Sequence, residues 1–222
     1  MNKYYIVLDL EFAKVSRSMR RQYGSCNEII QIGALLLNDA YEMVDRFSTF
    51  VATKYGKLDS TITRLTGITA DDLTGAPDIC AALDEMVRWL PDDGDIEFVA
   101  WSDSDQKQLE HELAFNQYSN PKLDNPWTDC QEMFGEFMGE ASRKFGLQYV
   151  LCIADIDRFD AKEHNALSDA YNTALIFADL MRGELKLSKH YIKADEAKET
   201  ENQPAFGCTL GDLFQDLIIG VA

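Results

Sequence analysis

The chain opens on Tyr4-Tyr5-Ile6-Val7-Leu8-Asp9-Leu10-Glu11, an apolar strand that two carboxylates interrupt. Because side chains alternate between the two faces of a strand, Asp9 and Glu11 share a face with Tyr5 and Val7. Two carboxylates on one face of a buried strand repel each other and lose hydration, which is costly unless a cation lies between them. The alternative is that the strand reaches solvent at this point, where acidic residues are ordinary.

Working outward from this strand, the next segments predict a mixed sheet. Residues 29–37 and 43–51 read as two further strands around the polar turn 38–40, which makes an antiparallel β-β-β opening. From residue 59 onward, helical patterns alternate with strands. Three antiparallel strands followed by alternating helices and parallel strands predict an α/β fold with helices packed on a mixed sheet. We expect helices at 59–67, 77–90, 103–115, 130–145 and from 165, with strands at 96–101 and near Trp127.

The composition of the chain changes after this α/β domain, which we assign to residues 1–183. Residues 184–206 are polar and rich in charge, as expected of a linker or a surface arm. Residues 209–221 then resume an apolar pattern that predicts an amphipathic helix. We therefore divide the chain into 1–183 and an arm with a C-terminal helix at 184–222, where residues 209–221 dock back, bind a protein partner or self-associate.

The charge balance limits the kind of partner that the chain can bind. The sequence has 38 acidic and 21 basic residues, so its net charge at pH 7 is −17. Proteins that bind long nucleic acid through its phosphates carry a basic face, so this charge argues against a tight, non-specific grip on long duplex. Screening over about 8 Å at physiological salt still allows a local basic patch to act. A loaded metal site built from carboxylates would also invert the charge around it.

Two features favour a cytoplasmic protein without membrane contact. No apolar run approaches the ~18 residues that cross a bilayer, and the first residues lack the pattern of a signal peptide. The five cysteines are odd in number, scattered, and without the spacing of a zinc site. We expect them to be reduced thiols.

Three residues far along the chain could complete a hydrolytic metal site with Asp9 and Glu11. Asp105 stands at the head of the helix that follows strand 96–101, where helix capping is the ordinary alternative. His164 precedes the helix that starts near Asn165, and Asp169 lies in the second turn of that helix. Carboxylates bind the divalent ions that catalyse phosphodiester hydrolysis, and an imidazole of pKa about 6.5 can take a proton from water.

Three segments, taken in chain order, resemble the three motifs of the DnaQ-like DEDDh 3′→5′ exonucleases: Asp9-Leu10-Glu11, then Trp101-Ser102-Asp103-Ser104-Asp105, then His164-Asn165-Ala166-Leu167-Ser168-Asp169. The segments 28–34 and 65–69 are also similar to this family, and the resemblance extends from residue 4 to about residue 182. Within this family the sequence most resembles the KapD branch, which is related to exonucleases that trim histone mRNA ends and small RNAs. Two departures, Ser102 with Ser104 and a long segment 148–163, could alter substrate choice.

The resemblance implies a ribonuclease-H-like fold and an enzyme that shortens single-stranded RNA or DNA, short oligonucleotides included, from the 3′ end. It implies two divalent ions, Mg²⁺ or Mn²⁺, with Asp9 bridging both ions. Glu11 and Asp169 would complete the first ion site, Asp105 would support the second, and His164 would be the general base. The pocket for the terminal nucleotide would be lined by Phe12, Ala13, Leu65, Thr66, Gly67 and Ile68.

Two alternatives stay open. The basic residues Lys14, Arg17, Arg20 and Arg21 directly follow the carboxylate-bearing strand; they either contact phosphates upstream of the cut or belong to an ordinary solvated loop. The whole chain could also be a catalytically weak adaptor that keeps the fold and binds nucleic acid or protein. Concentrated carboxylates favour the enzyme, because an adaptor has no use for their repulsion.

Overall fold

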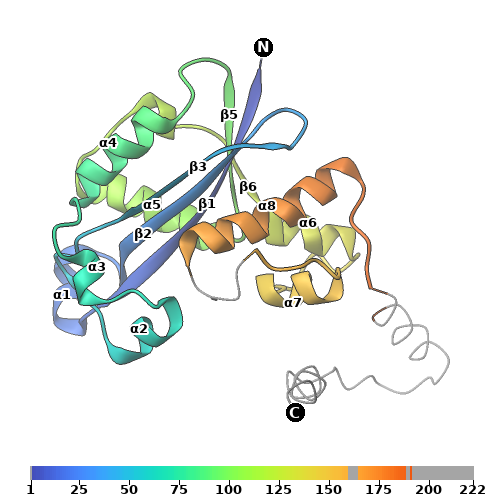
Figure 1. The fold of residues 1–222 in the computed structure, drawn as a ribbon. Coiled ribbons are helices and arrows are strands. Elements are labelled where there is room, and N and C mark those ends of the chain that lie inside the picture. Colours follow the sequence, from blue (N-terminus) through green and yellow to red (C-terminus); the bar gives the residue numbers. More distant parts are fainter. Residues whose placement is uncertain (1, 160–164, 189–190, 192–222) are drawn as a thin grey trace. The chain divides into compact units, whose positions relative to one another are not determined.

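The strand that carries the two carboxylates lies at the centre of a mixed sheet. In the computed structural model, which describes residues 2–159, 165–188 and 191, β1 (Lys3–Val15) pairs antiparallel with β2 (Asn27–Leu37) and parallel with β5 (Asp95–Ala100) (Figure 1). The order along the sheet is β3-β2-β1-β5-β6, and β4 pairs with the end of β1. The predicted α/β fold with three antiparallel strands and then parallel strands is confirmed. The remaining strands are β3 (Met43–Phe50), β4 (Gly56–Lys57) and β6 (Trp127–Asp129).

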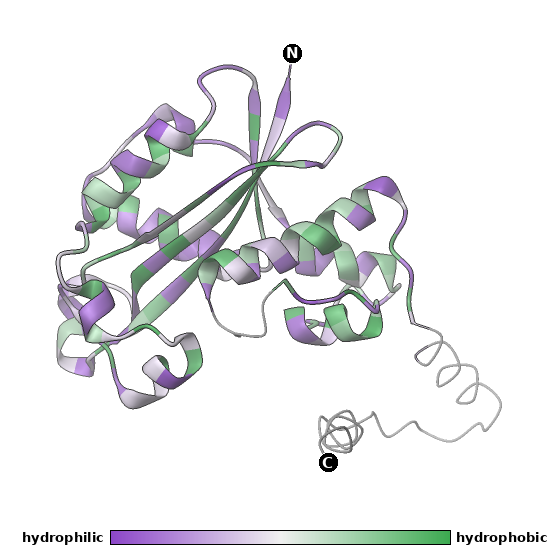
Figure 2. Cartoon of the chain, viewed as in Figure 1, coloured by the Kyte–Doolittle hydropathy of each residue, from purple (hydrophilic) through white to green (hydrophobic). Residues whose placement is uncertain are grey.

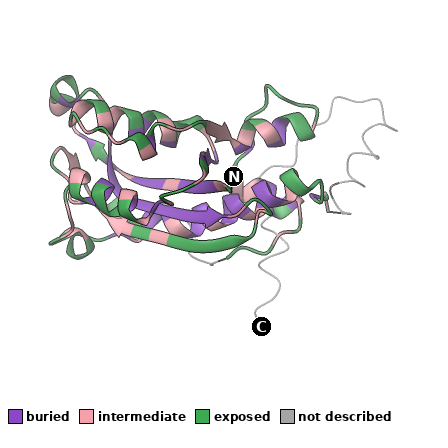
Figure 3. Cartoon of the chain, turned by 90° about the horizontal axis from the view of Figure 1, so that it is seen from above, coloured by how far each residue is buried: buried purple, intermediate pink, exposed green. Residues whose placement is uncertain are grey.

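Helices cover both faces of this sheet. α4 (Ile79–Trp89) and α5 (Asp103–Phe115) pack on one face, and α8 (Ala166–Arg182) packs on β1 and β2 from the other (Figure 1). The central strands β1, β2 and β5 are largely buried between these layers, as Figure 3 shows, and Figure 2 shows many hydrophobic residues along them. The other helices are α1 (Arg17–Tyr23), α2 (Ser60–Thr66), α3 (Ala70–Leu73), η1 (Pro121–Leu123), α6 (Cys130–Phe137) and α7 (Leu147–Ile153).

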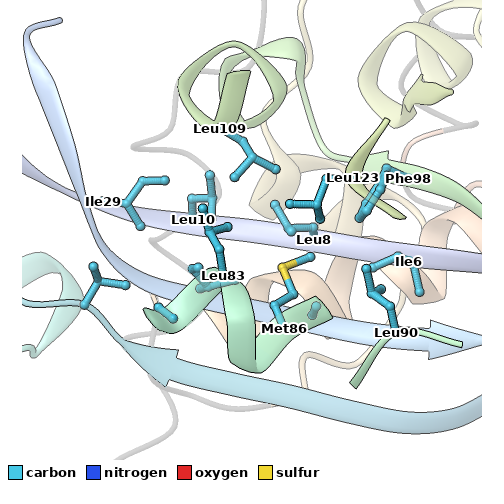
Figure 4. Close-up of a cluster of buried hydrophobic side chains, with 14 of the residues drawn as sticks. Ile6, Leu8, Leu10, Ile29, Leu83, Met86, Leu90, Phe98, Leu109 and Leu123 are labelled. Carbon is cyan, nitrogen blue, oxygen red and sulfur yellow. The ribbon is translucent and has the colours of Figure 1, made fainter. Parts of the chain in front are cut away.

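The main hydrophobic core forms on the face of β1 that points away from the carboxylates. Ile6, Leu8 and Leu10 pack there against Leu83 and Met86, in a larger cluster that Figure 4 shows. Each fully buried aliphatic side chain stabilises the fold by about 1.5–3 kcal/mol relative to an exposed one. This packing fixes the orientation of β1, so that Asp9 and Glu11 must face α8.

Capping residues define the ends of the helices that matter for the site. The side chain of Asn165 accepts a hydrogen bond from the backbone N–H of Ser168 and begins α8. Asp59 caps α2 in the same way, and Gly67, at φ 70°, ends it. Both starts agree with the sequence prediction, because Asn and Asp satisfy the free N–H groups of a first turn.

Some predicted elements differ from the structure. The helix expected at 130–145 is wrong: α6 ends at Phe137, and Gly139 turns the chain at φ 70°. The chain then forms α7, where the sequence predicted no helix. α1, α3 and β4 were also missed, since each is too short for a clear hydrophobic period.

The described residues belong almost entirely to one compact unit, Met1–Lys186, and Leu187–Ala222 form a second. The predicted arm and C-terminal helix at 184–222 lie mostly outside the described residues and stay a prediction. Within those residues, four cysteines are free thiols, and no helix is both long enough and apolar enough for a membrane crossing.

Gly33 allows α8 to lie directly against the sheet. It is the β2 partner of Asp9, and a Cβ atom at this position would lie 2.3 Å from the backbone of Ala166 and of Leu167. Such a distance is far inside van der Waals contact. Glycine is therefore required here, and it brings the first turn of α8 next to Asp9.

Gly33→Ala should destabilise the protein by about 1–3 kcal/mol or more, because the methyl group must push α8 off the sheet. Thermal unfolding measures this. Gly146→Ala is the matched control, since a Cβ there meets no atom within 4 Å. Equal unfolding temperatures for the two variants would contradict the close approach of α8.

Candidate metal centre

Three carboxylates from two elements meet on the face of β1 below the start of α8. Asp9 and Glu11 on β1 and Asp169 on α8 each offer a ligand oxygen, and these oxygens lie within 4.8 Å of one another. The structure therefore brings together two residues that are neighbours on one strand and one residue that follows about 160 positions later. Oxygen atoms at such distances can surround one hard divalent cation.

The site is buried inside the fold. Glu11 is 9% exposed and Asp169 is 7% exposed, while Asp9 is partly buried. β1 continues beyond Glu11 as far as Val15. The alternative that the strand reaches solvent at these acids is therefore wrong, and the repulsion between their carboxylates is not relieved by bulk water.

Asp105 joins this group from α5. Its carboxylate oxygen Oδ1 accepts a hydrogen bond of 3.1 Å from the backbone N–H of Leu10, and only 5% of the residue is exposed. The parallel pairing of β1 with β5 ends at Val7, so the N–H of Leu10 has no strand partner on that side. Asp105 supplies the missing acceptor and ties α5 to β1 between Asp9 and Glu11. A helix cap would bond the N–H groups of its own helix, whereas this bond of Asp105 reaches another element, β1.

Burial and mutual repulsion raise the pKa values of these acids. Burial, and then the charges of Asp169 and Asp105, raise the pKa of Glu11 to about 8. Burial also raises the pKa of Asp105 to about 7. The pKa of Asp9 lies well above its ordinary value for the same reason, with added repulsion from the other three. No ion pair among residues 2–159, 165–188 and 191 involves Asp9, Glu11 or Asp105, so a cation is what this donor set fits.

Two glutamines hold the start of α8 and its carboxylate in place. Gln31, the β2 partner of Glu11, accepts a hydrogen bond of 3.2 Å from the backbone N–H of Ala166. Gln148 on α7 donates from Nε2 to Oδ1 of Asp169 at 3.3 Å. Sequence reasoning assigned neither role. A lone glutamine in the apolar strand could have indicated the first, whereas the second depends on α7, which the sequence did not reveal.

His164, the predicted general base, lies outside the described residues, and its role stays a prediction. The described residues that flank it are fixed to α8. The ring of Phe159 stacks on Tyr171 with 4.0 Å between centroids, and its N–H donates to the side chain of Asn172. Asn165, on the other flank, is the cap of α8.

The residues predicted to line the nucleotide pocket fall into two groups. The side chains of Ala13, Thr66 and Ile68 are buried, and Ala13 packs with Ile68 in a small core under α2. Leu65 is 46% exposed and offers apolar surface. Phe12 is partly buried against the main core, and Gly67 presents only backbone. Contact between these residues and a nucleotide stays a prediction, and for the buried three it would involve backbone atoms.

The predicted basic residues are exposed and lie on a helix. Arg17, Arg20 and Arg21 belong to α1, so they are not part of a plain solvated loop. Arg20 also donates from Nε to the carbonyl of Val15 at 3.0 Å, which ties α1 to the end of β1. Their contact with phosphates stays a prediction at this point.

A mixed sheet with four acidic residues converging beside its central strand defines a class of metal-dependent hydrolytic enzymes. The family described as RNase_T: Exonuclease matches residues 6–177, and the chain belongs to this exonuclease family. The resemblance to DnaQ-like DEDDh exonucleases and the prediction of an enzyme are thereby confirmed.

Two relatives illustrate the family. The chain is 30% identical over 207 residues to ERI1 exoribonuclease 2 of Danio rerio, covering 83% of this chain and 36% of that protein. It is 28% identical over 211 residues to DNA polymerase III PolC-type of Staphylococcus haemolyticus (strain JCSC1435), covering 91% and 13%. The chain thus spans about a third or less of the length of these curated relatives.

Solved structures show the same fold. The nuclease domain of 3′hExo, a DEDDh family member bound to rAMP, superposes with a TM-score of 0.68 at 23% identity, covering 84% of this chain and 96% of that one. Cell-death related nuclease 4 gives a TM-score of 0.67 at 17% identity, covering 84% and 65%. E. coli Exonuclease I in complex with a dA16 oligonucleotide gives 0.59 at 14%, covering 82% and 41%.

Without metal ions, the protein should lose stability as the pH rises, and Glu11→Gln should reduce this loss. The unfolded pKa of Glu11 is near 4.5 and the folded pKa is about 8. Below the lower value the carboxyl is protonated in both states and costs nothing. Between the two values the folded state is progressively penalised, because it must either keep the proton or bury the charge.

Thermal unfolding in EDTA at pH 5 and pH 8 tests this. The variant should unfold at a higher temperature than the wild type, by a small margin at pH 5, where the penalty has only begun, and by a larger one at pH 8, at about 2–4 °C per kcal/mol of repulsion relieved. Added Mn²⁺ should stabilise the wild type more than the variant. Glu136→Gln, an exposed change on α6, is the control. A pH-independent difference between Glu11→Gln and the wild type would refute the argument.

Proposed function

We propose that this chain is a metal-dependent 3′→5′ exonuclease that hydrolyses the terminal phosphodiester bond of single-stranded RNA or DNA. The observation that carries the proposal is the convergence of Asp9, Glu11 and Asp169 within 4.8 Å, with Asp105 held beside them by the N–H of Leu10. Family membership supports the reaction type. The direction of cleavage and the single-stranded substrate rest on the resemblance to DEDDh exonucleases.

The proposal includes two divalent ions, Mg²⁺ or Mn²⁺, which would neutralise charge on the phosphate and activate water. In this arrangement Asp9 would contact both ions. Glu11 and Asp169 would complete one ion site, and Asp105 would support the other. The raised pKa of Glu11 supports this assignment, since a buried carboxylate without a cation is held at high energy.

The chain's own groups prepare the reaction in three ways. Gln148 donates to Asp169 and fixes the direction of its carboxylate. Gln31 and Gly33 keep the start of α8 against β1, so that the ligand oxygens stay close together. His164 would accept a proton from the attacking water; the nearest described residues on either side, Phe159 and Asn165, contact α8 and cap it, respectively.

The choice between RNA and DNA stays within the proposal. One relative is named an exoribonuclease, and similar folds were solved with rAMP, with a histone mRNA stem-loop and with dA16. A cytoplasmic location is also proposed, as is a protein contact or self-association through residues 209–221. The sequence features that favour these two points are the scattered cysteines and the apolar pattern of that segment.

Incubation of 5′-labelled RNA and DNA oligonucleotides with Mg²⁺ or Mn²⁺ tests the proposed activity. A ladder that shortens from the 3′ end should form with metal and not in EDTA. Asp9→Asn should reduce the rate by several orders of magnitude, because it removes the carboxylate expected to bind both ions. Asp93→Asn is the matched control, because Asp93 is exposed and lies outside the carboxylate cluster, and it should leave the rate of shortening unchanged.

Comparison of the two sugars in this assay would separate an RNA from a DNA substrate. Oligonucleotides that bind but are never shortened, with either metal, would overturn the exonuclease and favour the catalytically weak adaptor.

A further inference from the structure

Six exposed cations gather at the end of the sheet where β1 finishes. Together we call them the basic platform. None of them forms an ion pair within the part of the chain that the structure describes, whereas Lys3, Lys107, Lys122, Arg143 and Lys144 all do. The platform consists of Lys14 on β1, Arg17, Arg20 and Arg21 on α1, and Lys54 and Lys57 on the segment that forms β4.

The platform adjoins the candidate metal centre along one strand. Lys14 follows Glu11 by three residues, a separation of about 10 Å along an extended chain. Figure 1 shows α1 and α2 at this end of the sheet, to which the start of α8 also points. The acidic turn between β2 and β3 lies at the opposite end, because β2 runs antiparallel to β1. The six cations therefore lie near the candidate metal centre and away from the exposed acidic residues of the β2–β3 turn.

Like charges face each other within the platform. Lys14 on β1 is the direct cross-strand partner of Lys57 on β4. Two positive charges in such a pair destabilise a sheet, unless an anion binds them. Lys14 donates from Nζ to Oδ1 of Asn27 at 2.9 Å, a neutral partner that does not compensate its charge.

Buried hydrogen bonds fix α1 to α5, the helix that carries Asp105. The hydroxyl of Tyr23, at the end of α1, donates to the carboxylate of Glu112, and both residues are at most 2% exposed. Gln108 on α5 also donates from Nε2 to the hydroxyl of Tyr23, at 3.5 Å. These contacts hold a seven-residue helix that would not form in isolation.

A second buried acid fixes the other half of the platform. The carboxylate of Glu28, which is 7% exposed, accepts hydrogen bonds of 2.8 Å from the N–H groups of Lys54 and Tyr55, and another from Gly56. The ring of Tyr55 stacks on Tyr23 with 4.9 Å between centroids. The two basic segments are thereby fixed to each other and to the frame of the candidate site.

We propose that the basic platform binds phosphates of a single-stranded nucleic acid several nucleotides upstream of its 3′ end. This inference rests on the proposed function, which places the 3′ end at the carboxylates. The global charge of the chain repels a polyanion, so a local, rigid group of unpaired cations is needed to hold the strand. An ordinary solvated face would not require two buried acids to fix its backbone.

Fluorescence anisotropy with a 5′-fluorescein-labelled 12-nucleotide oligouridylate tests the platform without relying on hydrolysis. Ca²⁺ replaces Mg²⁺, and product analysis checks that the probe stays intact. The platform variant is Arg17→Gln/Arg21→Gln/Lys57→Gln; Arg20 is left in place because it bonds the end of β1. The charge-matched control is Arg46→Gln/Arg88→Gln/Lys186→Gln, which alters three exposed cations elsewhere in the same unit.

The platform variant should raise Kd about tenfold and reduce the slope of log K against log[salt] by about 2, since each lost phosphate contact on a single strand removes about 0.7. The control should leave the slope unchanged. The ratio of variant to wild-type Kd should be smaller for a trinucleotide, which spans less of the platform. Should the triple variant fail to fold, Lys57→Gln alone should still lower the slope by about 0.7.

Equal Kd values and salt slopes for the platform variant and the control would overturn the proposal. So would a 12-nucleotide probe that binds wild type no more tightly than the trinucleotide. Tight, platform-dependent binding without any shortening of oligonucleotides in Mg²⁺ would instead overturn the proposed function and leave the platform standing. Shortening of oligonucleotides in Mg²⁺, with no effect of the platform substitutions on binding, would overturn the platform and leave the proposed function standing.

Discussion

Repulsion among buried carboxylates is the constraint around which the rest of the structure is arranged. Burial and neighbouring charge raise the pKa of Glu11 to about 8, and the pKa values of Asp9 and Asp105 are raised as well. A fold that maximised its own stability would separate these groups. This fold instead brings α8 to 2.3 Å from where a Cβ on Gly33 would lie. Relief of this unfavourable energy would favour the binding of divalent ions, because a bound cation would attract each of these carboxylates.

The same strand connects two regions of opposite charge. Asp9 and Glu11 lie in the middle of β1, and Lys14 lies near its end, beside α1 and β4. A bound strand of nucleic acid would have its scissile phosphate at the carboxylates, where metal ions are needed to offset the negative charge. Its upstream phosphates would lie at the basic platform, whose cations need no metal ion to attract them. The net charge of −17 therefore does not conflict with a polyanionic substrate. The net charge would limit contact with nucleic acid to the part of the surface where the local electrostatic potential is positive.

Much of this arrangement could be predicted from the sequence, because it follows from local rules. Alternation along β1 placed Asp9 and Glu11 on one face, and Asn165 marked the start of α8 by its capping preference. The missed elements depend on tertiary contacts. α1 and α7 have seven residues each, too few for a stable isolated helix, and α1 is held by the Tyr23–Glu112 hydrogen bond. The helix predicted at 130–145 was wrong because α6 ends at Phe137 and Gly139 follows at φ 70°, which a helix cannot continue through.

The long segment before His164 acquires a meaning that its sequence did not show. From the resemblance alone, this segment, residues 148–163, is expected to alter substrate choice. In the structure its first part is α7, and Gln148 at the start of that helix donates to Asp169. The other amide atom of Gln148, Oε1, is buried without a hydrogen-bond partner among the described residues. A buried acceptor left unpaired is costly, and here it lies on the side chain that fixes a carboxylate of the candidate metal centre. The α7 part of this segment thus supports the position of Asp169.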